Sequence, residues 1–412
     1  MTERKVAIVL GGTSPHIELI RQLHERNFFV VLVDYLSNPP AKQYADVHIQ
    51  ESTLDCEAVL NVAIEFNASL VISACVDQAN ITACYVAEKL NLPRPYSYEL
   101  ANNITNKGYM KEVMVANNIP TTRYVFLDKD ENLTNFGLRF PVMVKPADSC
   151  AASGVKKANN FNELSVFLND AKKISRTGRT VVEEFFSGVE VSVYAFIKDR
   201  IANILMISER ISIIEGENQV LKCYATITPP NISEVALAKI QESTTCIANV
   251  FNLDNTPLHV QYIIDGDEIS VIEFAPRVGG GISYKNIKSN TGFDIISSTI
   301  DSYLQKSVDV RYQCSNRYFS VNLVYGVPST FHRMTGIEDL LNEGIVDSIH
   351  YHKTPGSVIT DDRASGGRIA AILISGDTRQ DVLDKVKITF ERINAFDSNG
   401  NQILRKDLYI KQ

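Results

Sequence analysis

A predicted β-hairpin in the second half of the chain constrains the fold most, because it sets a carboxylate and an amide side by side. Its strands are expected at 258–264 and 269–273, separated by a polar turn. Side chains alternate along a strand with period two, so Gln261 and Glu273 share a face only if the loop has an odd number of residues. A three-residue loop, 266–268, places them opposite each other. Two such oxygen-bearing side chains suit a magnesium nucleotide.

A cation and a glycine-rich turn follow the hairpin. Arg277 supplies one fixed positive charge, and the glycines at 279–281 leave backbone N–H groups bare. This combination suits a crowded phosphate or acyl-phosphate group. A structural salt bridge beside an ordinary turn is the alternative interpretation.

Further features lie upstream, where a short apolar strand ends close to Lys145. An unpaired ammonium in such surroundings is costly, and a phosphate partner would remove that cost. The small-residue loop 148–154 can close over phosphates, although small residues are also typical of a plain turn. Further on, Glu183 and Glu184 end a second predicted strand, and Glu190 closes a Gly-x-Glu connector. The order of these features predicts a nucleotide site.

This order resembles the ATP-grasp superfamily, and within it the carboxylate-amine ligases such as the bacterial L-amino acid ligases and D-alanine:D-alanine ligase. The resemblance covers roughly the first three quarters of the chain and rests on motif order. It implies an α/β protein with the ATP-grasp fold. The expected units are an N-terminal doubly wound pre-ATP-grasp domain (1–100), an ATP-grasp core (101–305) with a mobile α+β lid (about 120–180), and a C-terminal α+β unit (306–412) that completes the catalytic lobe.

The resemblance also implies catalytic and metal-binding roles. Arg277 is similar to the arginine that stabilises the transferred phosphoryl group, Lys145 to a catalytic lysine, and Gly280 to part of the substrate-side loop. Gln261 and Glu273 are similar to the magnesium ligands. The implied cofactors are ATP and Mg²⁺.

A set of nucleotide contacts is implied in the same way. Its members are Lys107, Lys145, Ser149, Ser153, Gly154, Glu183, Glu184, Phe186 and Glu190. Among them, the Glu184 carbonyl and the Phe186 amide would read the adenine edge, and Glu190 would accept from the ribose hydroxyls. Taken alone, Lys107 and Lys111 are also typical of a solvated helix face.

One residue departs from the family pattern. Many relatives carry asparagine two residues after the metal-binding glutamate, where this chain has Ala275. Magnesium prefers oxygen ligands and commonly keeps waters, so a water or substrate oxygen could fill the position. Catalysis therefore stays the expectation, with a nucleotide-sensing site as an alternative.

The first hundred residues alternate apolar strand runs with helical patterns, which predicts the doubly wound domain. Gly11 and Gly12 open a strand-to-helix turn whose free amides could bind an anion. Asp34 and Asp77 follow strands at the carboxyl edge, where open sheets bind ligands. Dinucleotide binding is the competing interpretation, but the turn lacks Gly-x-Gly-x-x-Gly spacing.

Composition narrows the functional classes. A net charge of -7 argues against nonspecific nucleic-acid binding, which depends on a basic surface. No apolar run approaches the ~18 residues of a membrane helix, and no signal peptide is visible. The 7 cysteines form no Cys-x-x-Cys pair and fit a reducing compartment. We therefore expect a cytoplasmic protein with small-molecule partners and neither nucleic-acid nor membrane partners.

Three functions are compatible with these features. The first is an ADP-forming ligase that joins a carboxylate, such as an amino acid, to an amine through an acyl-phosphate. The second is a bicarbonate-using carboxylase of the same superfamily, and the third, motivated by Ala275, is a nonenzymatic ATP-binding module. Arg210 is the candidate for holding a substrate carboxylate, with an ordinary surface arginine as the alternative. A homodimer is implied only by the resemblance.

Overall fold

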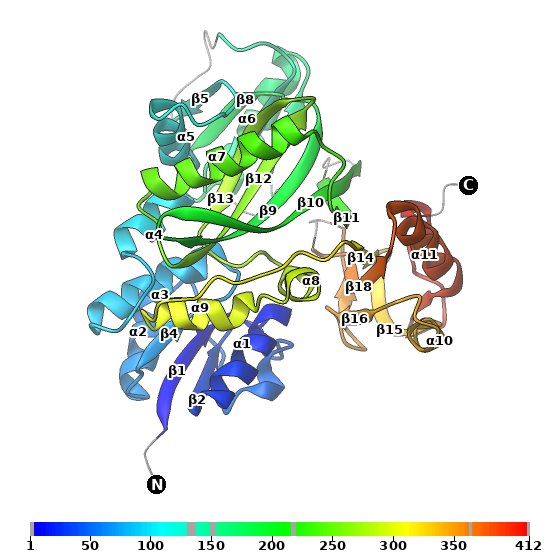
Figure 1. Cartoon of the computed structure of the whole chain (residues 1–412), viewed down its shortest axis with the longest axis horizontal. Coiled ribbons are helices and arrows are strands. Elements are labelled where there is room, and N and C mark those ends of the chain that lie inside the picture. The colour runs from blue at the N-terminus through cyan, green and yellow to red at the C-terminus, as the bar shows by residue number, and fades with distance from the viewer. Residues whose placement is uncertain (1–3, 130–136, 149–153, 216–219, 362–364, 410–412) are drawn as a thin grey trace.

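The computed structural model describes the chain except residues 1–3, 130–136, 149–153, 216–219, 362–364 and 410–412. The described residues form four β-sheets with helices packed around them (Figure 1). The N-terminal and C-terminal sheets lie at separate ends of the molecule, and the largest sheet runs between them (Figure 1).

The N-terminal sheet is parallel, with strand order β3-β2-β1-β4. Its strands are β1 (Lys5–Leu10), β2 (Phe28–Val33), β3 (Val47–Ile49) and β4 (Leu70–Ile72). The connecting helices are α1 (Ser14–Glu25), η1 (Lys42–Tyr44), α2 (Cys56–Glu65) and α3 (Asp77–Lys89). The strands β1, β2 and β4 are mostly buried, because parallel sheets are covered by helices. The expected α/β alternation of this region is confirmed.

A second, antiparallel sheet forms the lid region, with strand order β5-β8-β6-β7. Its strands are β5 (Tyr124–Leu127), β6 (Val142–Pro146), β7 (Lys156–Ala158) and β8 (Thr180–Glu184). Helices α4 (Tyr98–Thr105) and α5 (Lys107–Ala116) precede it, and α6 (Phe161–Ile174) packs on β6. Leu164 and Leu168 of α6 share a small separate core with Val142, Val144 and Val182.

The largest sheet is antiparallel, with strand order β13-β12-β9-β10-β11-β14-β18-β16. Its strands are β9 (Val189–Lys198), β10 (Ile201–Glu215), β11 (Val220–Thr228), β12 (Thr256–Asp265), β13 (Glu268–Ala275), β14 (Tyr318–Tyr325), β16 (Ser348–Tyr351) and β18 (Arg368–Gly376). The associated helices are α7 (Glu234–Val250), α8 (Ser283–Thr291) and α9 (Ile295–Tyr303). Pairing of β11 with β14 joins the C-terminal strands to the central ones.

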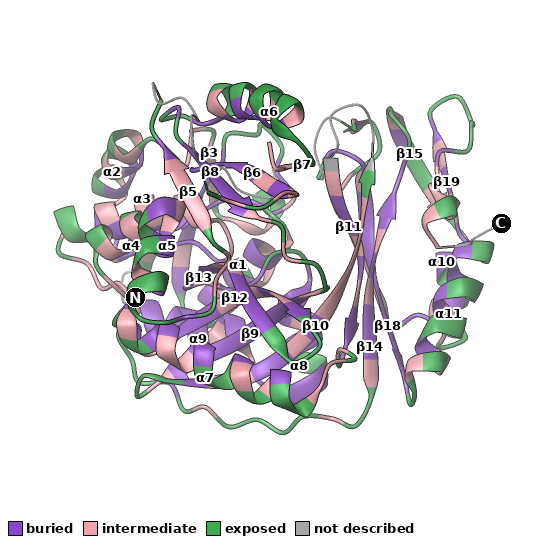
Figure 2. Cartoon of the chain, turned by 90° about the horizontal axis from the view of Figure 1, so that it is seen from above, coloured by how far each residue is buried: buried purple, intermediate pink, exposed green. Residues whose placement is uncertain are grey.

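The C-terminal region adds a three-stranded sheet of order β17-β15-β19. Its elements are β15 (Ser329–Thr335), α10 (Ile337–Asn342), β17 (Val358–Ile359), α11 (Arg379–Arg392), β19 (Asn394–Asp397) and η2 (Lys406–Leu408). Buried residues concentrate on the strands, while the outer faces of α6 and α11 are exposed (Figure 2). The proposed division at about residues 100 and 305 stays a prediction.

The hairpin at β12 and β13 brings Gln261 and Glu273 opposite each other, but not through the expected three-residue loop. Asp265 pairs with Glu268, so the turn holds two residues and begins with Gly266 at φ +60°. The register then shifts between Gln261 and Tyr262. This bulge adds one residue to β13 and restores the facing pair that an even turn would otherwise prevent.

The described residues of the stretch 209–230 lie largely in β10 and β11, although their apolar side chains follow no clear pattern. Two adjacent charges, Glu209 and Arg210, interrupt the pattern. Both are paired, Glu209 with Arg379 and Arg210 with Glu190, so the strand accommodates them.

Candidate active site

A cavity of about 340 Å³ lies between the lid sheet and the largest sheet. Its lining includes eight residues that the sequence predicted for nucleotide or metal, namely Lys107, Lys145, Glu183, Glu184, Phe186, Glu190, Gln261 and Glu273. Ser149 and Ser153 lie outside the described residues. Gly154 is described at φ +73° and packs near Pro146 and Ile174 rather than in the lining. The cavity thus assembles most of a site that is scattered along the chain.

The cavity wall includes one open carboxylate. Glu273 is 38% exposed, and its Oε2 lies 3.5 Å from Lys107 Nζ. Lys107 is the first residue of α5, where the Asn106 side chain accepts from two backbone amides and fixes the helix start. Gln261 faces Glu273 across the hairpin, and both residues line the cavity together with Lys107.

The cavity wall also includes a buried carboxylate, Glu183. Glu183 pairs with Lys145 of β6 and, at 2.6 Å, with Lys111 of α5. Burial alone would raise the pKa of Glu183, but the two ammonium groups lower it to about 2. Glu183 is therefore ionised and organises two cations. The solvated-face interpretation is wrong for Lys111, which is 3% exposed.

Glu184, the last residue of β8, is held by contacts with the rest of the protein. Glu184 forms ion pairs with Arg123 and Arg139, at 3.4 and 3.3 Å. Its backbone amide donates to the Arg123 carbonyl. These contacts fix the chain immediately before Phe186.

Glu190 and Arg210 form a pair at 2.6 Å within the cavity wall. Burial opposes the charge on Arg210, but Glu190 raises the pKa of Arg210 above its ordinary value. The surface-arginine interpretation is wrong, because only 23% of the Arg210 side chain is exposed. Arg210 is held by a carboxylate of the protein.

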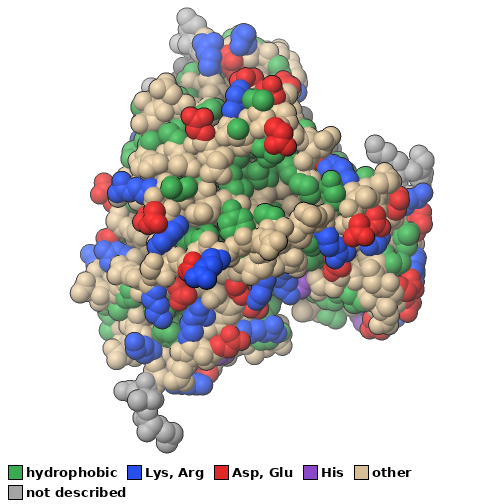
Figure 3. Space-filling model, in the orientation of Figure 1, with side chains coloured by type: hydrophobic (Ala, Val, Ile, Leu, Met, Phe, Trp, Pro, Cys, Tyr) green, Lys and Arg blue, Asp and Glu red, His purple; other side chains and the backbone are tan. Residues whose placement is uncertain are grey.

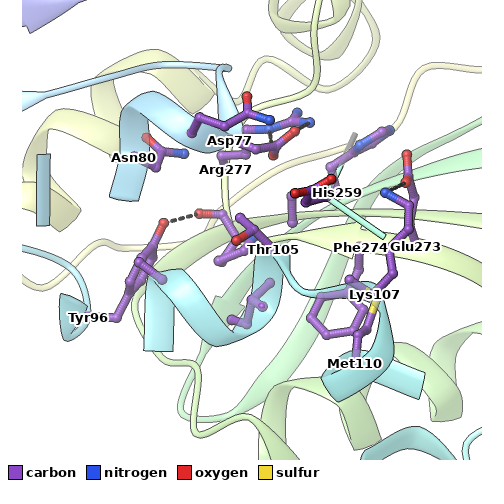
Figure 4. Close-up of a pocket in the computed structure, with 16 residues that line it drawn as sticks. Asp77, Asn80, Tyr96, Thr105, Lys107, Met110, His259, Glu273, Phe274 and Arg277 are labelled. Carbon is purple, nitrogen blue, oxygen red and sulfur yellow. Dashed lines mark hydrogen bonds and ion pairs between the residues drawn. The ribbon is translucent and has the colours of Figure 1, made fainter. Parts of the chain in front are cut away.

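A smaller cavity of about 60 Å³ adjoins the first and shares Lys107 and Glu273 with it. Figure 4 shows Arg277 directed at Asp77, with His259 between this pair and the pair of Lys107 with Glu273. Arg277 Nη2 donates to Asp77 at 2.9 Å, and its Nε donates to the second carboxylate oxygen.

This bidentate pair joins the end of β13 to the start of α3. Burial alone would raise the pKa of Asp77, but the Arg277 guanidinium lowers it below its usual value. Gly280 is exposed and belongs to the lining of neither cavity.

His259 is a residue that sequence analysis missed. It stacks on Tyr194 with ring centroids 5.0 Å apart and lies opposite Ala275 on the hairpin. Burial, together with Arg277 and Arg210, lowers the pKa of His259 to about 3, so it is neutral. The period-two spacing from Gln261 was the signal that could have found it.

The N-terminal turn does not offer the free amides that were expected. The Gly11 amide donates to the Val33 carbonyl, the Gly12 amide to Asp34, and the Thr13 amide to His16. Asp34 also accepts from the Leu36 amide, so it closes the turn instead of pointing at a ligand. Local partners already use the amides of Gly11, Gly12 and Thr13, so these three donors are not available to an anion.

The hairpin offers a small set of oxygen donors for magnesium. Over the described residues, no group of three His, Cys, Asp or Glu side chains could hold a metal ion. Gln261 and Glu273 could supply two oxygen ligands, which fits an ion that takes its other ligands from waters and substrate phosphates. The residues present therefore fit magnesium bound together with a nucleotide.

The middle of the chain matches a known family model. Residues 138–286 match the family model described as ATP-grasp domain. This segment contains Glu184, the hairpin of β12 and β13, and Arg277. Residues 138–286 thus carry an ATP-grasp domain.

Two relatives illustrate the range of this family. The mitochondrial carbamoyl-phosphate synthase (ammonia) of Homo sapiens is 26% identical over 176 residues, which is 42% of this chain and 11% of that protein. The formate-dependent phosphoribosylglycinamide formyltransferase of Prochlorococcus marinus is 24% identical over 281 residues, 66% of this chain and 70% of that protein. The chain thus spans a small part of the synthase.

Solved structures confirm the ATP-grasp fold over nearly the whole chain. L-amino acid ligase from Bacillus licheniformis superposes with a TM-score of 0.79 at 18% identity, covering 97% of this chain and 100% of that one. Phosphoribosylglycinamide synthetase from Anaerococcus prevotii gives 0.76 at 17% identity, covering 96% and 100%. Among the described residues, no helix is long and apolar enough to cross a membrane.

Proposed function

We propose that this protein is an ATP-dependent, ADP-forming ligase that joins a small carboxylate, such as an amino acid, to an amine. The observation that carries the proposal is the convergence of eight expected residues on one cavity, beside a second cavity that contains Arg277. The first cavity would hold MgATP, and the second would hold the carboxylate to be activated. On the face in Figure 3, acidic and basic side chains are interspersed, which supports small-molecule substrates over nucleic acid.

The first chemical step would be phosphoryl transfer. A substrate carboxylate oxygen bonds to the γ-phosphorus while the bond between that phosphorus and the β–γ bridging oxygen breaks, giving an acyl-phosphate and ADP. Lys107, Lys145 and Arg277 would offset the negative charge on the transferred group. Arg277 must then exchange part of its pairing with Asp77 for the phosphoryl oxygens.

The second step would form the carbon–nitrogen bond. The amine nitrogen bonds to the acyl carbon, the bond from this carbon to the phosphate oxygen breaks, and the nitrogen loses a proton. The backbone amides of the turn 279–281 are the predicted donors to the tetrahedral oxygen. Because Gly280 lies outside both cavity linings, this role requires the turn to approach the substrate when it binds. Magnesium on Gln261 and Glu273, when bound, would neutralise phosphate charge.

The mechanism is tested by isotope transfer. A carboxylate substrate labelled with ¹⁸O, chosen because it supports ADP release, should transfer one labelled oxygen to the released phosphate. Phosphate without label would exclude attack by the carboxylate on ATP and overturn the proposal.

A bicarbonate-using carboxylase is the second candidate. Arg368 extends the cationic lining of the large cavity, and its Nε donates to the Tyr325 hydroxyl. A cation at this position suits a small anion such as bicarbonate. ADP release that requires bicarbonate would favour this candidate. The expected cytoplasmic location and homodimer belong to the proposal in either case.

A further inference from the structure

Lys111 is a buried lysine that lies behind the nucleotide cavity. Its Nζ is 2.6 Å from Glu183 Oε2 and donates to the hydroxyls of Thr121 and Thr122, at 2.7 and 3.1 Å. It is 3% exposed, and it does not belong to the cavity lining. Lys111 is thus held by the two threonines and Glu183. Because it does not line the cavity, it is not placed to contact a ligand there.

Glu183 connects this hidden lysine to an accessible one. Lys145 and Glu183 both line the cavity, and they form an ion pair with each other. The three charged groups come from α5, β6 and β8, which places one in the helix before the lid and two in the lid sheet. One carboxylate therefore serves two ammonium groups that have different access to the cavity.

The balance of charge around Glu183 gives a reason for two lysines, Lys145 and Lys111, at this carboxylate. If Lys145 alone paired with Glu183, moving Lys145 to a phosphate would leave a buried carboxylate without a partner, which is strongly unfavourable. With Lys111 in place, Glu183 stays paired after Lys145 moves. Burial lowers the pKa of Lys111 and Glu183 raises it, which identifies Glu183 as the contact that keeps Lys111 charged.

We propose that Lys111 is a positioning residue, a reserve counter-ion that keeps Glu183 paired and so frees Lys145 to bind the nucleotide phosphates. The inference rests on the proposed nucleotide site. It assigns a function to a lysine that touches no substrate.

The test is a double-mutant cycle read by equilibrium binding. The affinity of a non-hydrolysable ATP analogue with Mg²⁺ is measured for wild type, Lys111→Met, Glu183→Gln and the double variant, with Lys111→Arg as the conservative control. Lys111→Met should bind about tenfold or more weakly, as expected for contacting residues in one network. The double variant should recover to the level of Glu183→Gln, because no buried carboxylate then retains Lys145, and Lys111→Arg should bind like wild type.

Other outcomes separate the two proposals. Unchanged affinity in Lys111→Met, or a double variant as weak as Lys111→Met, would overturn the counter-ion role while leaving the nucleotide site intact. Absence of binding by the wild-type protein would overturn the nucleotide site itself.

A second variant keeps the test decisive if Lys111→Met fails to fold. Lys145→Met should then fold with a melting temperature close to wild type, because Lys111 still neutralises Glu183. Loss of folding in Lys145→Met as well would contradict the asymmetry between the two lysines and overturn the inference.

Discussion

Two carboxylates line the same cavity, and the protein holds them in opposite ways. Glu183 is 7% exposed and paired with two lysines, whereas Glu273 is 38% exposed and lies 3.5 Å from one. The buried carboxylate is committed to the protein and sets the positions of cations. The open carboxylate has oxygen surface left for a metal and its nucleotide. Two residues of the same charge in one cavity can therefore have different roles: one holds cations of the protein in place, and the other is available to bind a ligand.

The largest expected effect comes from removing a cation that faces the phosphates. Lys145→Ala and Arg277→Ala should each lower the ADP production rate by about a hundredfold or more, because each removes charge stabilisation of the transferred group. Steady-state ADP assays, with circular dichroism to verify the fold, measure this. Near-normal ADP production by either variant would place the phosphates elsewhere.

The next prediction tests whether Glu273, unlike Glu183, is available to bind a metal. Glu273→Ala should raise the Mg²⁺ concentration needed for nucleotide binding by at least the 10- to 100-fold that even indirect metal partners contribute. Titration with Mg²⁺ at fixed analogue concentration measures it. Glu268→Ala, an exposed change at the hairpin turn, is the matched control and should leave the titration unchanged.

The third prediction concerns acid stability. The pKa of Glu183 is about 2 in the folded protein, against 4.5 ordinarily, so its contribution is present above pH 4.5 and is lost as the pH falls towards 2. The loss should be about 3 kcal/mol of unfolding free energy. Denaturant melts at several pH values measure how steeply the free energy of unfolding falls with pH, for wild type and for the Lys111→Met, Glu183→Gln double variant. Equal slopes between pH 4.5 and 2 would contradict the assignment to Glu183.

The smallest effect is expected outside the cavity. Asp34→Ala should lower the free energy of unfolding by about 1–3 kcal/mol, because the amides of Gly12 and Leu36 lose their acceptor. Thermal melts measure this change. The affinity for the non-hydrolysable ATP analogue should stay at the wild-type value. Weaker binding would indicate that the N-terminal turn contributes to the nucleotide site.

Much of the fold and site could be predicted because it depends on local patterns. Apolar strand runs and the order of Lys145, Glu183, Glu190 and the hairpin are visible in the chain. The bulge beside Gln261 was not, because a two-residue turn and a bulge give the same facing pair as a three-residue loop. Burial of Lys111 was missed since spacing along a helix does not reveal what covers it. The use of the N-terminal amides depends on Asp34 and His16, side chains that the fold brings to the turn.

The most direct measurement is ADP release from MgATP across a matrix of amino acids, simple amines and bicarbonate, with Lys145→Ala as the blank. The proposed function predicts ADP release that requires one carboxylate and one amine together and that disappears in Lys145→Ala. Release that persists in Lys145→Ala, or no release in any mixture despite bound ATP, would contradict it.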